Sequence, residues 1–265
     1  MAAFVERYGP WAVVAGASEG IGASFSKKLA SRGMNLVLVA RRAAPLEQLA
    51  AVLRREHGVE VRVQPLDLGS ADAISGIDMA TAGLDVGLLI YNAAYSPIGA
   101  FIDVEVEEHF KAVQVNVHGP LRFSHYFGRR FAKRGKGGII LMSSLSGFQG
   151  TAMVANYAAT KAYDTILAEG LWYELRSRGV DVLACIAGAT LTPNYESATD
   201  EIPSKGLARP MEADEVTEQA LGDLGSQPTG VSGRRNRFAS VLLSRILRRR
   251  AAIEMVSKET VRSYG

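Results

Sequence analysis

Short apolar segments rich in Val, Ile and Leu alternate along the chain with longer amphipathic segments. The apolar segments are typical of strands buried on both faces, and the amphipathic segments are typical of helices that cover a sheet. We expect strands at 11–15, 35–40, 59–65, 86–91, 138–143 and 180–187. We expect helices between them at 20–31, 46–57, 71–82, 105–134 and 156–178.

The strict order of strand and helix predicts one parallel sheet, because parallel neighbours need a crossover between them. Right-handed crossovers then place helices on both faces, which gives a doubly wound, Rossmann-like α/β fold. The chain has 265 residues, of which 48% are hydrophobic. This length suits one large domain and supplies a substantial core.

After Ala187 the alternation weakens. The segment 188–209 holds two prolines and several Thr, Ser and Asn residues without a strong period. A segment that follows a strand of such a sheet usually lies over the crevice at the carboxyl ends of the strands, so we expect a mobile lid here. A helix at 212–224, a turn at 225–233 and a final helical stretch at 236–261 should follow.

We divide the chain into a domain over 1–233, which includes the lid, and a basic, amphipathic helical extension over 234–265. From Arg234 onward nine Lys and Arg residues stand against two Glu, a net charge of +7, so the overall +3 leaves −4 for the rest. We therefore expect no nucleic-acid partner. Two interpretations of the extension stay open: a helix packed on the lid or on a neighbouring subunit, which we favour, and a helix on a membrane surface.

Metal and disulfide chemistry find no support in the sequence. Cys185 is the single cysteine, and the four histidines show no ligand-pair spacing. A lone cysteine in a buried strand is typical of an inert apolar residue in a reducing compartment. No leader-like segment or apolar run long enough to cross a bilayer is visible. We therefore expect a cytoplasmic protein without a metal, peripheral to a membrane only if the extension binds one.

Glycines follow the first expected strand in the order Gly16-Ala-Ser18-Glu-Gly20-Ile21-Gly22, where a helix should begin. Glycines allow positive φ and a close approach of the backbone to a pyrophosphate, whose charge the helix N-terminus attracts. The arrangement predicts that these residues bind a dinucleotide cofactor. A tight turn without a ligand is the alternative.

Arg41 and Arg42 follow the second expected strand. A dinucleotide fold that prefers NAD commonly places an acidic residue near this point, whereas arginine suits the 2′-phosphate of NADP. We therefore expect NADP(H) as the cofactor. NAD(H) stays open, because Glu19 in the glycine turn would repel a nearby phosphate. A solvated arginine pair at a helix start is the alternative.

Polar or small residues also follow the third and fourth expected strands. Asp67 could accept the adenine amino group of the cofactor, or it could cap the next helix. Asn92 and Ala93 could line the cofactor, although the amide of Asn92 could equally tie neighbouring strands together.

Tyr157 and Lys161 lie four residues apart in an Ala-rich helical segment, so both side chains project from one face. A nearby ammonium group stabilises a phenolate and equips a tyrosine for acid–base catalysis. Ser144 lies at the end of the fifth expected strand, and Asn116 lies in the long helix before that strand. A packing tyrosine with a solvated lysine is the alternative.

At these residues the chain resembles the single-domain branch of the short-chain dehydrogenase/reductase family, from about Trp11 to Thr192. The pattern is closest to the hydroxysteroid dehydrogenases and 3-ketoacyl reductases of that family. The family patterns T-G-x-x-x-G-x-G and N-N-A-G are matched by 15–22 and 91–94, and its Ser followed by Y-x-x-x-K by Ser144, Tyr157 and Lys161.

The resemblance implies a role for each matched residue. Tyr157 would protonate or deprotonate the substrate oxygen, and Lys161 would hold the nicotinamide ribose and favour the phenolate. Ser144 would orient the substrate, and Asn116 would anchor a water that relays protons. Tyr157 and Lys161 would thus contact the cofactor as well as act in catalysis.

Three departures from the family pattern remove none of these catalytic groups. Ala15 stands where the family usually has Thr, and Tyr91 and Ala94 alter the ends of N-N-A-G. Ile186-Ala187-Gly188 stands where Pro-Gly is usual. By the same resemblance Gly188, Thr190 and Thr192 would contact the nicotinamide end of the cofactor.

The resemblance implies an NADP(H)-dependent oxidoreductase that interconverts a ketone and a secondary alcohol on a hydrophobic small molecule, such as a steroid or an acyl compound. We also expect a homo-oligomer. Two other classes stay open. A catalytically retired NADP-binding regulator would keep the glycine turn and lose the catalytic residues, and a membrane-tethered interaction protein would depend on the extension alone.

Overall fold

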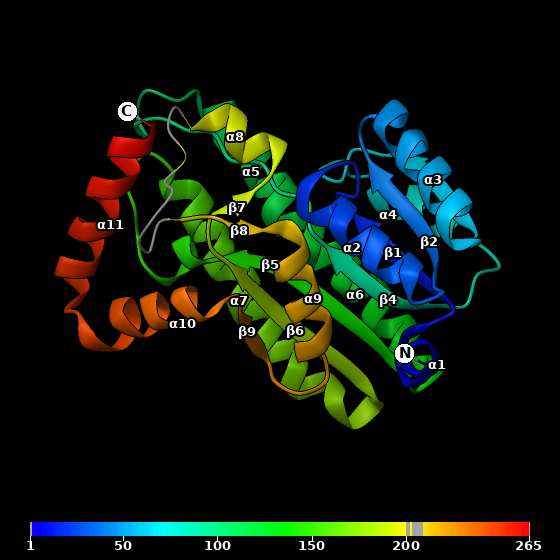
Figure 1. The fold of residues 1–265 in the computed structure, drawn as a ribbon. Helices are drawn as coiled ribbons and strands as arrows, with labels where there is room; N and C mark the ends of the chain where they lie inside the picture. Colours follow the sequence, from blue (N-terminus) through cyan, green and yellow to red (C-terminus); the bar gives the residue numbers. More distant parts are fainter. Residues whose placement is uncertain (1, 200–201, 203–208, 265) are drawn as a thin grey trace.

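The computed structural model describes residues 2–199, 202 and 209–264. A parallel sheet of seven strands, in the order β3-β2-β1-β4-β5-β6-β9, forms the centre of the molecule (Figure 1). The strands are β1 (Trp11–Ala15), β2 (Asn35–Ala40), β3 (Val61–Pro65), β4 (Val86–Tyr91), β5 (Gly137–Ser144), β6 (Val180–Ala187) and β9 (Thr229–Val231). The expected doubly wound parallel fold is confirmed.

Two layers of helices cover the sheet. One layer consists of α2 (Gly20–Ser31), α3 (Ala43–His57) and α9 (Ala213–Asp223). The other consists of α4 (Ala73–Ala80), α6 (Gly119–Arg134) and α7 (Ala155–Leu175). A hydrophobic core lies on each face of the sheet, and alternate residues of β1 pack into one core or the other. Ala12 and Val14 face the first layer of helices. Trp11, Val13 and Ala15 face the second layer. The strands are therefore buried on both faces.

The expected turn at 225–233 contains a seventh strand. β9 pairs with β6 through Thr229, Gly230 and Val231. The sequence prediction missed this strand because a three-residue strand at a sheet edge is too short to show periodicity. A short helix near the start, α1 (Ala2–Tyr8), was also missed.

The base of the expected lid is closed by a second, two-stranded sheet. Its strands are β7 (Thr190–Leu191) and β8 (Met211–Glu212), and Thr190 pairs with Met211. The short helix α8 (Pro193–Ala198) follows β7. Most of the remaining part of the expected lid, 200–201 and 203–208, lies outside the described residues.

The helix expected over 105–134 is not one regular helix. It consists of α5 (Val106–Val113), a π-helical turn (Gln114–His118) and α6. Tyr91 at the end of β4 donates its hydroxyl to the Val115 carbonyl of that turn, at 2.7 Å. A Cβ at residue 119 would lie 1.8 Å from the same Tyr91 oxygen, so only glycine fits there. The π-helical turn is thus shaped by the tyrosine that departs from the N-N-A-G pattern.

The expected C-terminal helix is divided in two. α10 (Arg234–Val241) continues into a π-helical turn (Leu242–Ile246), and α11 (Arg249–Tyr264) begins after a break. α11 contacts the segment after β5, where the hydroxyls of Thr151 and Thr260 lie 2.8 Å apart and the Ser257 hydroxyl accepts from the Ala152 amide at 3.1 Å. In these contacts the helix packs on the segment after β5 and not on the expected lid. The division of the chain at residue 233 stays a prediction.

Replacing Gly119 with alanine should destabilise the fold by about 1–3 kcal/mol, because the added methyl group must displace the Tyr91 hydroxyl in a packed core. Urea unfolding monitored by circular dichroism measures the change. Gly170→Ala is the matched control, because a Cβ at that position of α7 meets no atom within 4 Å. Equal midpoints for the two variants would contradict this account of the turn.

Candidate active site

The predicted cofactor residues converge where β1 ends. Gly16 and Gly20 adopt φ of +87° and +55°, and the Gly16 amide donates to the Val39 carbonyl of β2 at 2.7 Å. A Cβ at Gly22 would lie 1.9 Å from the Gly16 carbonyl oxygen. The turn is therefore a compact glycine cradle before α2, whose first amides lack helical acceptors.

Two neighbouring segments close around this turn. The Asn92 side chain donates to the Gly16 carbonyl at 2.9 Å, which ties β4 to the turn as the strand-tying interpretation expects. A Cβ at Gly16 would lie 2.6 Å from the Ala93 amide nitrogen, and one at Gly20 would lie 2.8 Å from the Thr192 methyl group. The absence of glycine side chains thus leaves the room that a pyrophosphate needs, and the cradle fits a dinucleotide.

The arginines after β2 lie at the surface beside the glycine turn. Both Arg41 and Arg42 are exposed. Arg42 forms an ion pair with Glu19 at 2.7 Å, so the carboxylate that would oppose a phosphate is partly neutralised. Asp67 is exposed, and its Oδ1 accepts from the Gly69 amide at 3.0 Å. Asp67 therefore closes a turn and does not cap α4, because Asp72 holds the N-cap position of that helix.

Lys161 is buried between α7 and β5. Its Nζ donates to the Met142 carbonyl at 2.8 Å and to Asp164 Oδ2 at 2.9 Å. The same Nζ lies 5.8 Å from the centre of the Tyr157 ring. Lys161 and Asp164 are only 3% and 2% exposed, so their ion pair lies inside the protein.

The buried ion pair between Lys161 and Asp164 affects the pKa of both residues. Burial favours the neutral amine, but the Asp164 carboxylate and then Tyr157 outweigh it and raise the pKa of Lys161 above its ordinary value. Burial likewise raises the pKa of Asp164, against the opposing effect of the Lys161 ammonium. The ion pair with Asp164 thus favours the protonated form of Lys161, whose ammonium group lies 5.8 Å from the centre of the Tyr157 ring.

Asn116 and Ser144 lie on the two elements that flank Tyr157. Asn116 is fully buried in the π-helical turn, where its Oδ1 accepts from the Tyr95 amide and its Nδ2 donates to the Tyr95 carbonyl, both at 2.8 Å. The same Nδ2 donates to the Thr160 hydroxyl at 3.0 Å, next to Lys161. Ser144 ends β5, and its hydroxyl accepts from the Ser146 amide at 3.3 Å.

The segment after β6 runs past the same edge of the sheet. The Thr190 hydroxyl donates to the Gly188 carbonyl at 3.0 Å, and the Thr192 hydroxyl caps α8 by accepting from the Tyr195 amide at 3.1 Å. A Cβ at Gly188 would lie 2.6 Å from the side-chain nitrogen Nδ2 of Asn236, so α10 packs directly on this backbone.

Two buried residues near the site were missed from the sequence. Asp164 follows Lys161 by three residues on the inward face of α7, and this helical spacing of opposite charges is a signal that could have found it. Asn236 gave no comparable signal, because its contact with Gly188, which is distant in sequence, depends on the tertiary fold.

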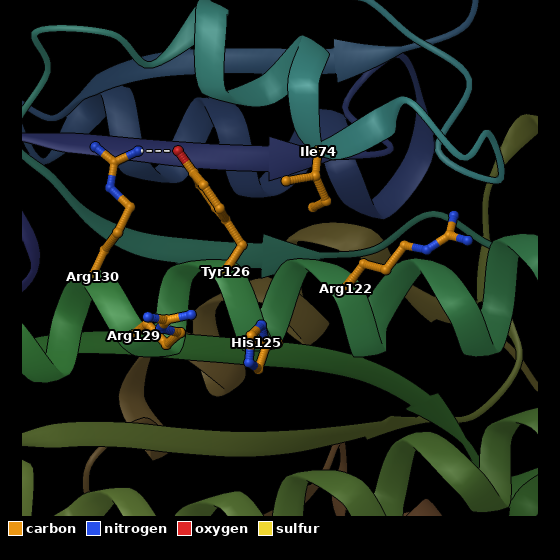
Figure 2. Close-up of a pocket in the computed structure, with 6 residues that line it drawn as sticks. All are labelled: Ile74, Arg122, His125, Tyr126, Arg129 and Arg130. Atoms are coloured by element: carbon orange, nitrogen blue, oxygen red, sulfur yellow. Dashed lines mark hydrogen bonds between the residues drawn. The ribbon is translucent and has the colours of Figure 1, made fainter.

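The groove in Figure 2 lies elsewhere, between α4 and α6. Two of its arginines have hydrogen-bond partners: Arg130 donates to the Tyr126 hydroxyl at 2.6 Å and Arg122 to the Ser70 carbonyl at 2.9 Å. None of the predicted site residues lines it. Its lining residues are Ile74, Arg122, His125, Tyr126, Arg129 and Arg130.

Within 2–199, 202 and 209–264, no group of three or more His, Cys, Asp or Glu side chains could hold a metal ion. No helix in that part of the chain is long and apolar enough to cross a bilayer. Burial raises the pKa of the Cys185 thiol to about 12, so this cysteine is protonated at neutral pH.

Comparison with known proteins gives three concordant results. Residues 10–203 match the short chain dehydrogenase family. A 7beta-hydroxysteroid dehydrogenase of Clostridium sardiniense is 36% identical over 88% of this chain and 89% of its own. A solved structure concerned with 7beta-hydroxysteroid dehydrogenase stereoselectivity superposes with a TM-score of 0.89, at 31% identity, over 96% of this chain and 98% of its own.

A second solved structure, a short-chain dehydrogenase from Sphingobium yanoikuyae in complex with NADPH, has a TM-score of 0.77 at 30% identity and covers 90% of this chain and 96% of its own. The resemblance found in the sequence motifs is thereby confirmed over most of the chain. The protein belongs to the short-chain dehydrogenase family and is an NAD(P)-dependent oxidoreductase that acts on a small molecule.

Proposed function

We propose that the enzyme interconverts a ketone and a secondary alcohol on a hydrophobic small molecule of the steroid or acyl class, with NADP(H) as cofactor and Tyr157 as the general acid and base. One observation carries the chemistry: the buried ammonium of Lys161 lies 5.8 Å from the Tyr157 ring. A fixed cation in a dry site stabilises the phenolate that proton transfer leaves behind.

The nicotinamide, when bound, supplies or accepts the hydride. In the direction of reduction, the Tyr157 hydroxyl donates its proton to the carbonyl oxygen of the substrate. In oxidation, the phenolate takes the proton of the alcohol. The Ser144 hydroxyl, at the end of β5, holds the substrate oxygen towards Tyr157.

Asn116 supports this proton transfer by shaping the backbone. Its side chain already makes hydrogen bonds to Tyr95 and Thr160. It therefore fixes the π-helical turn against α7, and we place the water that passes protons to Lys161 beside this turn. Gly188, Thr190 and Thr192 would contact the nicotinamide end of the cofactor, and Thr192 also lies against Gly20 of the glycine cradle.

The proposal of a steroid substrate rests on the similarity to known hydroxysteroid dehydrogenases. The Clostridium sardiniense protein is a 7beta-hydroxysteroid dehydrogenase, and its similarity extends beyond the cofactor half of the fold to 88% of this chain. We further propose that the segment from β7 to α8 and the extension from α10 to α11 border the substrate. Burial raises the pKa of Tyr264 at the end of α11, with smaller contributions from Tyr195 of α8 and from Tyr157, so these rings lie within electrostatic range of one another.

The choice of NADP(H) rests on Arg41 and Arg42, which flank the adenosine end of the glycine cradle. Glu19 is paired with Arg42 and opposes a phosphate less than an unpaired carboxylate would. The Sphingobium yanoikuyae relative, which is in complex with NADPH, supports the same choice.

We further propose that the chain assembles with copies of itself. Phe110, Leu121 and Ile166 lie on α5, α6 and α7, and they are 62%, 44% and 67% exposed. Large apolar side chains exposed on adjacent helices favour contact with another apolar surface. The cytoplasmic location and peripheral membrane contact remain predictions.

Tyr157→Phe should lower kcat by at least about 100-fold, because it removes the proton donor and keeps the ring. Turnover is followed by NADPH absorbance with a ketosteroid, and cofactor binding is followed by fluorescence. Binding should be unchanged. Tyr173→Phe, an exposed tyrosine at the far end of α7, is the matched control and should retain full turnover. Turnover retained in Tyr157→Phe would disprove the assignment.

Arg41→Asp should lower the ratio of kcat/KM with NADPH to kcat/KM with NADH by at least about tenfold, because it replaces a charge-assisted contact with repulsion. Arg55→Asp changes an exposed arginine of α3 remote from the turn and should leave the ratio unchanged. An unchanged ratio in Arg41→Asp would overturn the proposed preference.

Sedimentation velocity should show more than one chain per particle for the unaltered protein. Ile166→Asp should shift the particles towards single chains, because a charge would be buried in the interface. Ile246→Asp alters an equally exposed residue outside α5–α7 and should leave the assembly intact. A monomeric unaltered protein would contradict the proposal.

A further inference from the structure

Among the described residues, Asp164 is the one buried charge near the site to which the proposed reaction assigns no task. The residue is 2% exposed, and its Oδ2 accepts from Lys161 Nζ at 2.9 Å. The second oxygen, Oδ1, is buried without a hydrogen-bond partner among the described residues. An incompletely bonded carboxylate in the interior is costly to the fold, so stability alone does not account for it.

Few other groups stabilise the positive charge of Lys161. The Met142 carbonyl contributes only a neutral acceptor at 2.8 Å. A lysine as buried as this one sheds its proton readily unless a counter-ion is present. Asp164 is the only carboxylate within hydrogen-bonding reach of Lys161 Nζ in the part of the chain that the structure describes.

No other ionisable group described near Lys161 and Asp164 takes the place of Asp164 as the counter-ion of the lysine. Tyr163 on α7 and Tyr91 on β4 lie within electrostatic range of Asp164, and the raised pKa values of both keep them uncharged at neutral pH. Tyr157 is the group on which Lys161 acts. β5 has no ionisable side chain. Four ionisable side chains on the remaining neighbours have partners of their own. Asp181 of β6 binds Arg7 and Tyr8, and His118 binds Gln114. Glu108 of α5 binds Tyr95, and Arg122 of α6 binds the Ser70 carbonyl.

We propose that Asp164 is a positioning residue of the proposed reaction: it anchors the ammonium group of Lys161 against β5 and keeps it charged over the pH range in which Tyr157 exchanges its proton. Because the lysine lies between the carboxylate and the tyrosine ring, Asp164 acts on the reaction through Lys161. The inference rests on the proposed function for its catalytic meaning, while its electrostatic part depends on the fold alone.

The direct test is the titration of Lys161 itself, followed by NMR of the lysine side-chain nitrogens and ε-carbons in the full chain without cofactor. The Lys161 signal is identified by its loss in Lys161→Arg. In the unaltered protein Lys161 should remain protonated up to at least the ordinary lysine pKa of about 10.4. A lower value in the unaltered protein would overturn the proposal without any variant.

Asp164→Asn keeps the shape of the side chain and removes its charge. The pKa of Lys161 should fall by at least about two units, because burial then acts without a counter-ion. Asp164→Glu should restore the higher value. Glu169→Gln removes an exposed carboxylate of the same helix and should leave it unchanged. A pKa of Lys161 that is equal in folded Asp164→Asn and the unaltered protein would disprove the proposal.

Kinetics supply the second readout. In Asp164→Asn the rise of alcohol oxidation with pH should move to higher pH, because the phenolate loses its cation, and Asp164→Glu should bring it back. A lower rate with an unmoved pH profile would indicate a merely structural role and would overturn the proposal. The titration requires no turnover, so an inactive unaltered protein would refute the proposed function and leave the test of Asp164 intact.

Discussion

The parallel register of the central sheet is the constraint on which the site depends. Because β1, β4, β5 and β6 are neighbours and run in the same direction, their carboxyl ends meet at one edge. The glycine turn, Asn92, Ser144 and Gly188 are far apart in the sequence and are brought together by this pairing alone. A helix N-terminus and two helical layers then complete the crevice.

At this edge of the sheet, the proposed proton transfer depends on how the ammonium group of Lys161 is buried. Lys161 is held by the Met142 carbonyl and Asp164, while the hydroxyls of Ser143 and Thr165 both donate to its own backbone carbonyl, at 2.7 and 3.1 Å. The lysine is thus fixed at its head and at its backbone. A charge that is fixed before the reaction begins needs no reorganisation when the phenolate forms.

The sequence predicted those parts of the fold that have a strong period or a local motif. The strands β1, β2, β4 and β6 begin and end where apolar runs do, and α2 begins in the glycine turn, because local sequence sets these limits. Short elements escaped prediction: β9 is stabilised by pairing with β6, and β7 and β8 exist only because the two ends of a long segment meet.

In the candidate site, too, some features have a local sequence signal and others depend on tertiary contacts. Tyr157 and Lys161 could be found because helical spacing places them on one face. The π-helical turn could not be found, because the contact that holds it, from the Tyr91 hydroxyl to the Val115 carbonyl, joins residues distant in sequence. Asn236 likewise reaches Gly188 only once α10 has packed on the sheet. Contacts of this kind join residues that are distant in sequence, so they produce no periodic pattern in the amino-acid sequence.

The central claim is that this chain passes a hydride between a nicotinamide and a hydrophobic ketone. Incubation with NADPH that carries deuterium at C4, in either configuration, and a ketosteroid tests it most directly, with mass spectrometry of the steroid product. The account predicts an alcohol that carries one deuterium on the carbinol carbon for one of the two labelled cofactors. An alcohol without deuterium from both, or no alcohol from a panel of steroid and acyl ketones, would contradict it.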